Sequence, residues 1–188
     1  DQYASTGANA TIVAGEGNTL KGLYNYTFGR DNQILGETGH SHFVAGTGNV
    51  VSGNTHSHMV LGKQNTMEAT ASYSTAFGYL NKIKDGSAAA IVGGIGANVS
   101  GLAAIGIGYL ANATGSYALA MGKNAKSSAA DAMGLGTGGT GSATTAIGIL
   151  GKATATKAVS IGSGSQAQTS GSIAIGRGTM GAGRLGGI

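Results

Sequence analysis

The sequence predicts an all-β fold, a narrow parallel β-solenoid built from about twelve short coils. Three observations support this prediction. Glycine occurs 37 times and proline never in 188 residues, and only 10% of the residues are charged. A glycine follows a short apolar segment at regular intervals of about 14 to 16 residues, which is the mark of an internal structural repeat. Before each of these glycines, larger and smaller side chains alternate with the period of two that marks a β-strand.

The repeat is aligned on these anchor glycines, which are Gly15, Gly29, Gly46, Gly62, Gly78, Gly94, Gly108, Gly122, Gly136, Gly148, Gly162 and Gly176. The interval that ends at Gly46 is the longest, and the one that ends at Gly148 is the shortest. Each coil of a solenoid contacts only its neighbours, about 4.8 Å away. We expect one domain, 1–188, with longer repeats rich in Asn and aromatic residues in 1–87, regular repeats in 88–179 and a glycine-rich end in 180–188.

The strand before each anchor is expected to have two different faces. Larger apolar residues stand three and one positions before the glycine, as at Tyr26, Phe28, Phe43 and Phe77, and small or polar residues stand six, four and two positions before it. We expect the larger groups to fill the interior and the flat, small-residue face to pack against sister chains. A coil this small buries little apolar area alone, and a homotrimer is a natural closed arrangement for a narrow prism.

A second short strand is expected after each anchor. It holds an apolar residue five places after the glycine, as at Ile34 and Val51, and an asparagine three places after it in the first five coils, at Asn18, Asn32, Asn49, Asn65 and Asn81. Stacked in register, these side-chain amides are expected to form a ladder in which each pairs with the coils above and below.

Composition excludes several classes of function. The chain has no cysteine, so neither disulfides nor thiolate chemistry are expected. No apolar run approaches the roughly 18 residues of a membrane span. The net charge of +4 comes from scattered groups, whereas nucleic-acid binding needs a basic stripe with stacking aromatic residues. Glycine-rich matches to dinucleotide-binding motifs all fall on anchors and are followed by strands. No cofactor is therefore expected.

The four histidines form two matched pairs. His40 and His42 stand six and four residues before Gly46, and His56 and His58 hold the same places in the next coil. Two stacked imidazoles can reach one zinc ion, but no carboxylate shares their columns and no nucleophile accompanies them. The pattern favours packing at an interface or contact with a ligand over a metal site or a catalytic centre. The sequence leaves open which way this face points.

Two tyrosines are further binding candidates. Tyr79 and Tyr109 each stand one residue after an anchor, in a column that also contains charged residues such as Lys63 and Lys123, so it is expected to be exposed. Tyrosines on a rigid scaffold are common binding anchors. Most aromatic residues lie in 1–79, so this half is the better place to look for a specific receptor surface.

Three segments carry a resemblance to a known family. The stretches SYALAMGKNAKSSA (116–129), KAVSIGSGSQAQTSG (157–171) and SIAIGRGT (172–179) resemble the head repeats of trimeric autotransporter adhesins, the YadA-like head. The match is close over 88–179 and looser before it. The resemblance implies a left-handed parallel β-roll, assembled as a homotrimer at the tip of a bacterial outer-membrane fibre. Such heads bind host matrix proteins (collagen, fibronectin, laminin) or epithelial receptors. The stalk and membrane anchor would lie outside this fragment.

Other functions remain as alternatives. A left-handed β-helix acyltransferase is also trimeric, but it is built from hexapeptide repeats, with larger coils and protruding loops, so an enzyme is not expected. An ice-binding solenoid needs a uniform Thr-x-Thr face, whereas the face here changes along the chain. A self-associating surface protein of biofilms is the remaining alternative.

Overall fold

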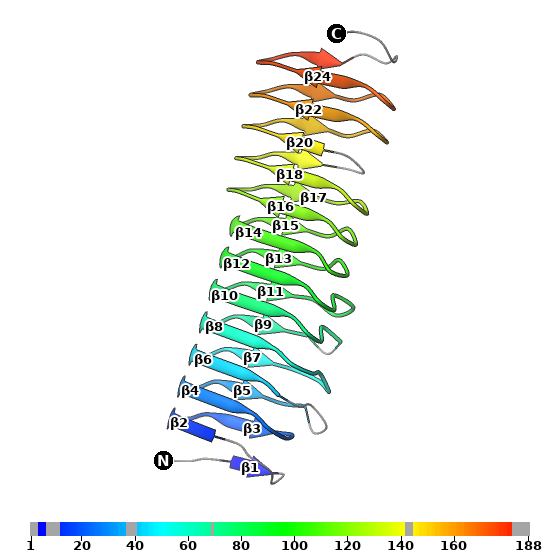
Figure 1. The fold of residues 1–188 in the computed structure, drawn as a ribbon. Coiled ribbons are helices and arrows are strands. Elements are labelled where there is room, and N and C mark those ends of the chain that lie inside the picture. Colours follow the sequence, from blue (N-terminus) through cyan, green and yellow to red (C-terminus); the bar gives the residue numbers. More distant parts are fainter. Residues whose placement is uncertain (1–3, 7–11, 37–40, 69, 142–144, 182–188) are drawn as a thin grey trace.

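A computed structural model describes residues 4–6, 12–36, 41–68, 70–141 and 145–181. Within these residues every regular element is a β-strand, and there is no helix. The chain winds into a stack of about twelve coils, with β1 (Ala4–Thr6) at one end and β24 (Ile173–Ile175) towards the other (Figure 1). The prediction of an all-β parallel solenoid is therefore confirmed.

Each coil contributes one strand to each of two parallel sheets. The first sheet has 12 strands, which end at or beside the anchor glycines: β2 (Ile12–Glu16), β4 (Tyr26–Arg30), β6 (Phe43–Thr47), β8 (Met59–Lys63), β10 (Thr75–Tyr79), β12 (Ile91–Ile95), β14 (Ile105–Tyr109), β16 (Leu119–Met121), β18 (Met133–Leu135), β20 (Thr145–Ile147), β22 (Val159–Ile161) and β24 (Ile173–Ile175).

The second sheet has 13 shorter strands, which follow the anchors: β1 (Ala4–Thr6), β3 (Thr19–Lys21), β5 (Gln33–Ile34), β7 (Val50–Val51), β9 (Thr66–Met67), β11 (Lys82–Ile83), β13 (Asn98–Val99), β15 (Asn112–Ala113), β17 (Lys126–Ser127), β19 (Thr140–Gly141), β21 (Lys152–Ala153), β23 (Gln166–Ala167) and β25 (Met180–Gly181). In both sheets the strands pair in the order of the coils, so equivalent repeat positions stack into columns.

The anchor column requires glycine for two reasons. Gly15 pairs with Gly29, and Gly29 with Gly46, so glycine stacks on glycine from coil to coil. At Gly62 the φ angle is +117°, a region that residues with a Cβ rarely adopt. A Cβ built on Gly62 would also collide with the carbonyl oxygen of Gly78 in the next coil. The repeated glycine is therefore imposed by backbone geometry.

The expected orientation of the 12-stranded sheet is wrong. The residues two positions before the anchors, such as Val44 and Val60, are fully buried, and they pack against the apolar residues of the 13-stranded sheet, such as Val51 and Met67. The larger residues three and one positions before the anchors point outward instead, and Phe28 is 39% exposed. The same correction applies to Tyr26, Phe43 and Phe77, which are also exposed.

The reason for this inversion is the small width of the coil. The interior between the two sheets holds one side chain from each, and in the last quarter of the chain these are mainly small, such as Ala146, Ala153 and Ala167. At Gly106 even a Cβ would press against a methyl group of Val99. Since protein interiors are close-packed, aromatic rings have no room inside and must occupy the outer face.

Candidate functional site

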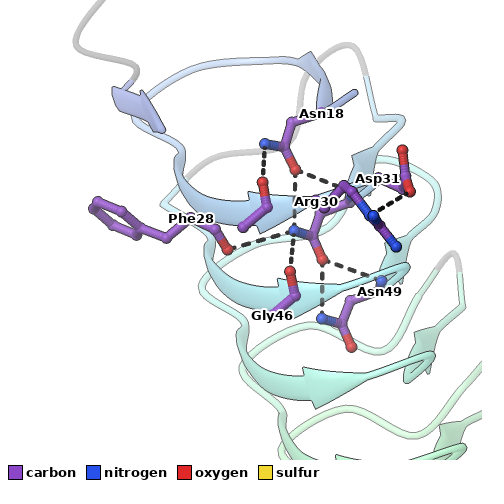
Figure 2. Close-up of polar contacts among 8 residues, drawn as sticks. Asn18, Phe28, Arg30, Asp31, Gly46 and Asn49 are labelled. Carbon is purple, nitrogen blue, oxygen red and sulfur yellow. Dashed lines mark hydrogen bonds and ion pairs between the residues drawn. The ribbon is translucent and has the colours of Figure 1, made fainter. Parts of the chain in front are cut away.

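The five asparagines form a continuous ladder inside the coils. The Nδ2 group of Asn32 donates to Oδ1 of Asn18 (3.0 Å), and that of Asn49 donates to Oδ1 of Asn32 (2.9 Å). The same bond links Asn65 to Asn49 (3.0 Å) and Asn81 to Asn65 (3.1 Å). All five side chains are buried. Figure 2 shows the first rungs of this ladder.

Each asparagine of the ladder also binds backbone groups of the neighbouring coils. Oδ1 of Asn32 accepts the backbone N–H of Asn49 (3.1 Å), while Nδ2 of Asn32 donates to the carbonyl oxygen of Gly46 (2.9 Å). The ladder therefore supplies partners for buried backbone groups at the corner after each anchor. Its role is structural, because buried polar groups need such partners, and it offers no group to a ligand.

His42 and His58 lie inside the coils, not on a surface. Both are buried, and their rings stack with centroids 5.0 Å apart and planes inclined by 14°. His56, two residues before His58, is exposed. His40 lies outside the described residues. The prediction of His42 and His58 as ligand contacts is thus not compatible with their burial, because the position four residues before the anchor points inward.

The buried histidines extend a second ladder, in which a side chain of one coil accepts a backbone N–H of the next. Oδ1 of Asn25 accepts the N–H of His42 (3.1 Å). Nδ1 of His42 accepts the N–H of His58, and Nδ1 of His58 accepts the N–H of Ser74, both at 3.3 Å. Finally, Oγ of Ser74 accepts the N–H of Ala90 (3.0 Å). Histidine here is an acceptor within the fold.

Coil length explains why this column needs polar side chains in one part of the chain and alanine in another. In the shorter coils of the second half, the N–H at this position donates to the carbonyl three residues earlier, as from Ala104 to Gly101 and from Ala118 to Gly115 (both 3.3 Å). The coils that end at Gly46, Gly62, Gly78 and Gly94 are longer. In these coils the same N–H donates to the preceding coil, and a side chain of that coil must supply the acceptor.

Burial lowers the pKa of His58 from 6.5 to about 4, because desolvation disfavours the charged ring, and the nearby His56 acts in the same direction. Because Nδ1 accepts a backbone N–H, the neutral ring carries its proton on Nε2. His58 is therefore neutral at pH 7 and is poised to destabilise the fold in acid.

The described residues contain no group of three or more His, Asp, Glu or Cys side chains close enough to hold a metal ion. The two stacked imidazoles also use their Nδ1 atoms for backbone hydrogen bonds. These stacked histidines are therefore not arranged as the centre of a metal site.

The predicted tyrosines lie where the sequence places them, at the exposed corner after the anchors. Tyr79 is 38% and Tyr109 is 49% exposed, and Ile95 lies between them in the register of the sheet. The ammonium group of Lys63 lies over the ring of Tyr79, 5.7 Å from its centroid, at a distance typical of a cation–π contact. This corner presents aromatic groups that can contact a partner.

A further candidate surface consists of residues that the sequence predicts to lie in the interior. The residues three and one positions before the anchors form two columns on the outer face of the 12-stranded sheet, which we call the apolar ribbon. None of them is charged: they are Ile12, Ala14, Tyr26, Phe28, Phe43, Ala45, Met59, Leu61, Thr75, Phe77, Ile91, Gly93, Ile105, Ile107, Leu119, Met121, Met133, Leu135, Thr145, Ile147, Val159, Ile161, Ile173 and Ile175.

The apolar ribbon is continuous along the stack. The rings of Phe28 and Phe43 contact each other with centroids 5.8 Å apart. The ring of Phe77 covers Gly93 of the next coil so closely that a Cβ there would collide with it. Twelve coils at about 4.8 Å give the ribbon a length of roughly 50 Å. The sequence identified the positions of these larger apolar residues correctly, but the prediction that they point into the interior was wrong.

Comparison with protein-family models and with curated proteins gives no match. No helix of the described residues is long and apolar enough to cross a membrane.

Proposed function

We propose that the chain is the head of a bacterial surface adhesin that assembles as a homotrimer and binds host matrix proteins or host-cell receptors. The observation that carries the proposal is the apolar ribbon, which runs the length of the solenoid without one charged residue. The left hand of the roll, the trimer and the location at the outer membrane follow from the resemblance of the regular repeats to adhesin heads.

The ribbon calls for a partner because of its size and chemistry. Phe43, Met59 and Ile175 are 39%, 44% and 64% exposed in the single chain. Soluble monomers rarely leave an apolar patch of more than a few hundred Å² open to water. Burial of such area is favourable by about 25 cal/mol per Å². Three copies with their ribbons around one axis would bury all three, and closed rotational symmetry leaves no copy unpaired.

The proposed trimer suits adhesion for a physical reason. A rigid stack of coils presents the same corners and faces three times around the axis, so weak contacts add up through avidity. The corner of Tyr79 and Tyr109 borders the ribbon at the ends of β10 and β14. Exposed aromatic and apolar groups on a rigid scaffold suit contact with a macromolecular partner, so binding is the function that this surface supports best.

The assembly is tested by measuring the mass of the purified chain with light scattering at micromolar concentration. We expect three times the 18.2 kDa of one chain. Phe43→Lys, on the ribbon, is expected to give a folded monomer. Thr66→Lys, on the outer face of the other sheet, is the matched control and is expected to remain trimeric. A wild-type monomer would contradict the proposed assembly.

The binding activity is tested separately with the assembled protein on collagens, fibronectin, laminin and epithelial cells. Saturable binding to at least one of them is expected, and binding should weaken when Phe43→Lys removes avidity. Association of the protein only with itself across this panel would instead favour a self-associating surface protein.

A further inference from the structure

The charges of the chain are divided unevenly between its two halves. In the first half two of the cations pair with carboxylates, Arg30 with Asp31 and Lys82 with Glu68. From residue 86 to residue 181 there is a single carboxylate, Asp131, against five cations: Lys123, Lys126, Lys152, Lys157 and Arg177. No ion pair is formed among the described residues of this half. The second half therefore carries an uncompensated positive field.

Two of these cations lie on the outer face of the 13-stranded sheet. Lys126 of β17 and Lys152 of β21 are exposed, and both pair in register with Thr140 of β19, which lies between them. They are thus two coils apart in one column, about 10 Å from each other. The outward column that contains them has no carboxylate over the whole stretch from β13 to β23.

The other side chains of this face are short hydrogen-bonding groups. The column of the two lysines also holds Asn98, Asn112, Thr140 and Gln166, and the neighbouring outward positions hold Ser100, Thr114, Ser128, Thr154 and Gln168. Hydroxyl and amide groups both donate and accept hydrogen bonds. Backbone pairing fixes all of them on a rigid, repeating surface.

We propose that the outer face of the 13-stranded sheet, from β13 to β23, binds a sulfated polysaccharide. The ammonium groups of Lys126 and Lys152 contact sulfates, and the surrounding hydroxyl and amide groups hydrogen-bond the sugars. This inference does not rest on the adhesin proposal. The face points away from the apolar ribbon, since the two sheets enclose the interior between them, so it stays open if the ribbon is covered.

The chemistry of the face argues against other polyanions and surfaces. It has no aromatic side chain, so it cannot stack the bases of a single-stranded nucleic acid. The outward positions of this face from β13 to β23 hold no large apolar residue, and Val99 of β13 points inward. The face therefore lacks the anchors of a protein hot spot and the apolar groups that insert into a membrane interface. A flat array of donors with spaced ammonium groups suits a hydrated, anionic sugar chain.

The test measures binding of the purified protein to immobilised heparin, to chemically desulfated heparin and to duplex DNA at near-physiological salt. The double variant Lys126→Gln with Lys152→Gln is expected to bind heparin at least about tenfold more weakly, because it loses two charge-assisted contacts. Lys157→Gln with Arg177→Gln removes the same charge from the corners of the coils. This matched control is expected to stay within about threefold of the wild type.

The inference is overturned by equal losses in the two double variants, which indicate net charge alone, by equal binding to desulfated heparin, or by duplex DNA bound as tightly as heparin. Circular dichroism and thermal unfolding of all variants check that the fold is kept. Loss of heparin binding without loss of binding to matrix proteins separates this surface from the proposed adhesin function. Failure of the wild type to bind heparin contradicts the inference and leaves the adhesin function to its own test.

Discussion

Replacing Asn49 by alanine tests the asparagine ladder at its centre. The side chain of Asn49 donates to Oδ1 of Asn32 (2.9 Å) and to the carbonyl of Gly62 (2.8 Å). Its Oδ1 accepts the backbone N–H and the Nδ2 group of Asn65, both at 3.0 Å. The substitution takes away the acceptor of a buried backbone N–H and the donor of a buried carbonyl, without providing replacements.

The expected cost of Asn49→Ala is about 3 kcal/mol, since each buried polar group that loses its partner costs roughly 1–3 kcal/mol. Asn112→Ala is the matched control, because Asn112 faces outward and accepts one long bond from Asn98 (3.3 Å). We expect the control to cost less than about 1 kcal/mol.

Two measurements suit a repeat protein whose unfolding need not be two-state. Urea unfolding at one protein concentration gives the overall stability. Hydrogen exchange of the Asn65 amide reads the local effect, and about 3 kcal/mol corresponds to roughly 100-fold faster exchange. If the amide of Asn65 stays as protected in Asn49→Ala as in Asn112→Ala, the ladder does not stabilise the coils and the reasoning is refuted.

Three further predictions concern other columns. The pKa of His58 is about 4 in the folded state against 6.5 in the unfolded state, so only the unfolded state takes up a proton between these values; stability is full above pH 6.5 and falls by about 3 kcal/mol towards pH 4. Urea unfolding from pH 7.5 to 4 should show this fall in stability for His56→Ser and a smaller fall for His58→Ser. Equal falls in the two variants would contradict the assignment. Gly62→Ala should prevent accumulation of folded protein, because the new Cβ would meet the Gly78 carbonyl at a φ of +117°. The control Gly86→Ala, at a φ of +81° with open space around it, should cost only about 1 kcal/mol. Similar soluble yields of the two variants would argue against the steric explanation. Tyr109→Ala should weaken binding of the assembled protein to its matrix partner at least about tenfold if this corner makes the contact. Leu102→Ala, a residue of similar exposure, is the control. Unchanged affinity of Tyr109→Ala would show that this corner is not part of the binding surface.

Much of the fold could be predicted because key positions of the repeat are occupied by residue types with strict backbone requirements. Glycine at the anchors reports a φ that other residues avoid, and the spacing of the anchors reports the length of each coil. The asparagines three residues after the anchors indicated a ladder, since identical amides stacked in register can bond one another. These inferences needed only local geometry and periodicity.

The direction of the first strand could not be predicted in the same way. Alternation shows that a strand has two faces, but not which one is inside. In an ordinary domain the larger apolar face is buried, and this expectation placed Phe28 and Phe77 in the interior. The structure places Thr27 and Ala76 there instead. Only the width of the space between the two sheets decides the matter, and that width belongs to the tertiary structure.

The histidines show how one structural constraint can resemble a functional motif. Two HSH segments one coil apart suggest a metal site or a catalytic centre, yet the inner member of each pair accepts a backbone N–H of the next coil. The shorter coils of the second half meet the same demand with a tight turn and can use alanine, as at Ala104 and Ala118. The acceptors from Asn25 to Ser74 in this column therefore mark positions where the next coil is a longer one. The outward columns are less constrained, although Ser52 and Glu68 each bind a backbone group of the next coil, and differences between coils there can serve binding. The apolar ribbon, the tyrosine corner and the lysines of the 13-stranded sheet are all of this kind.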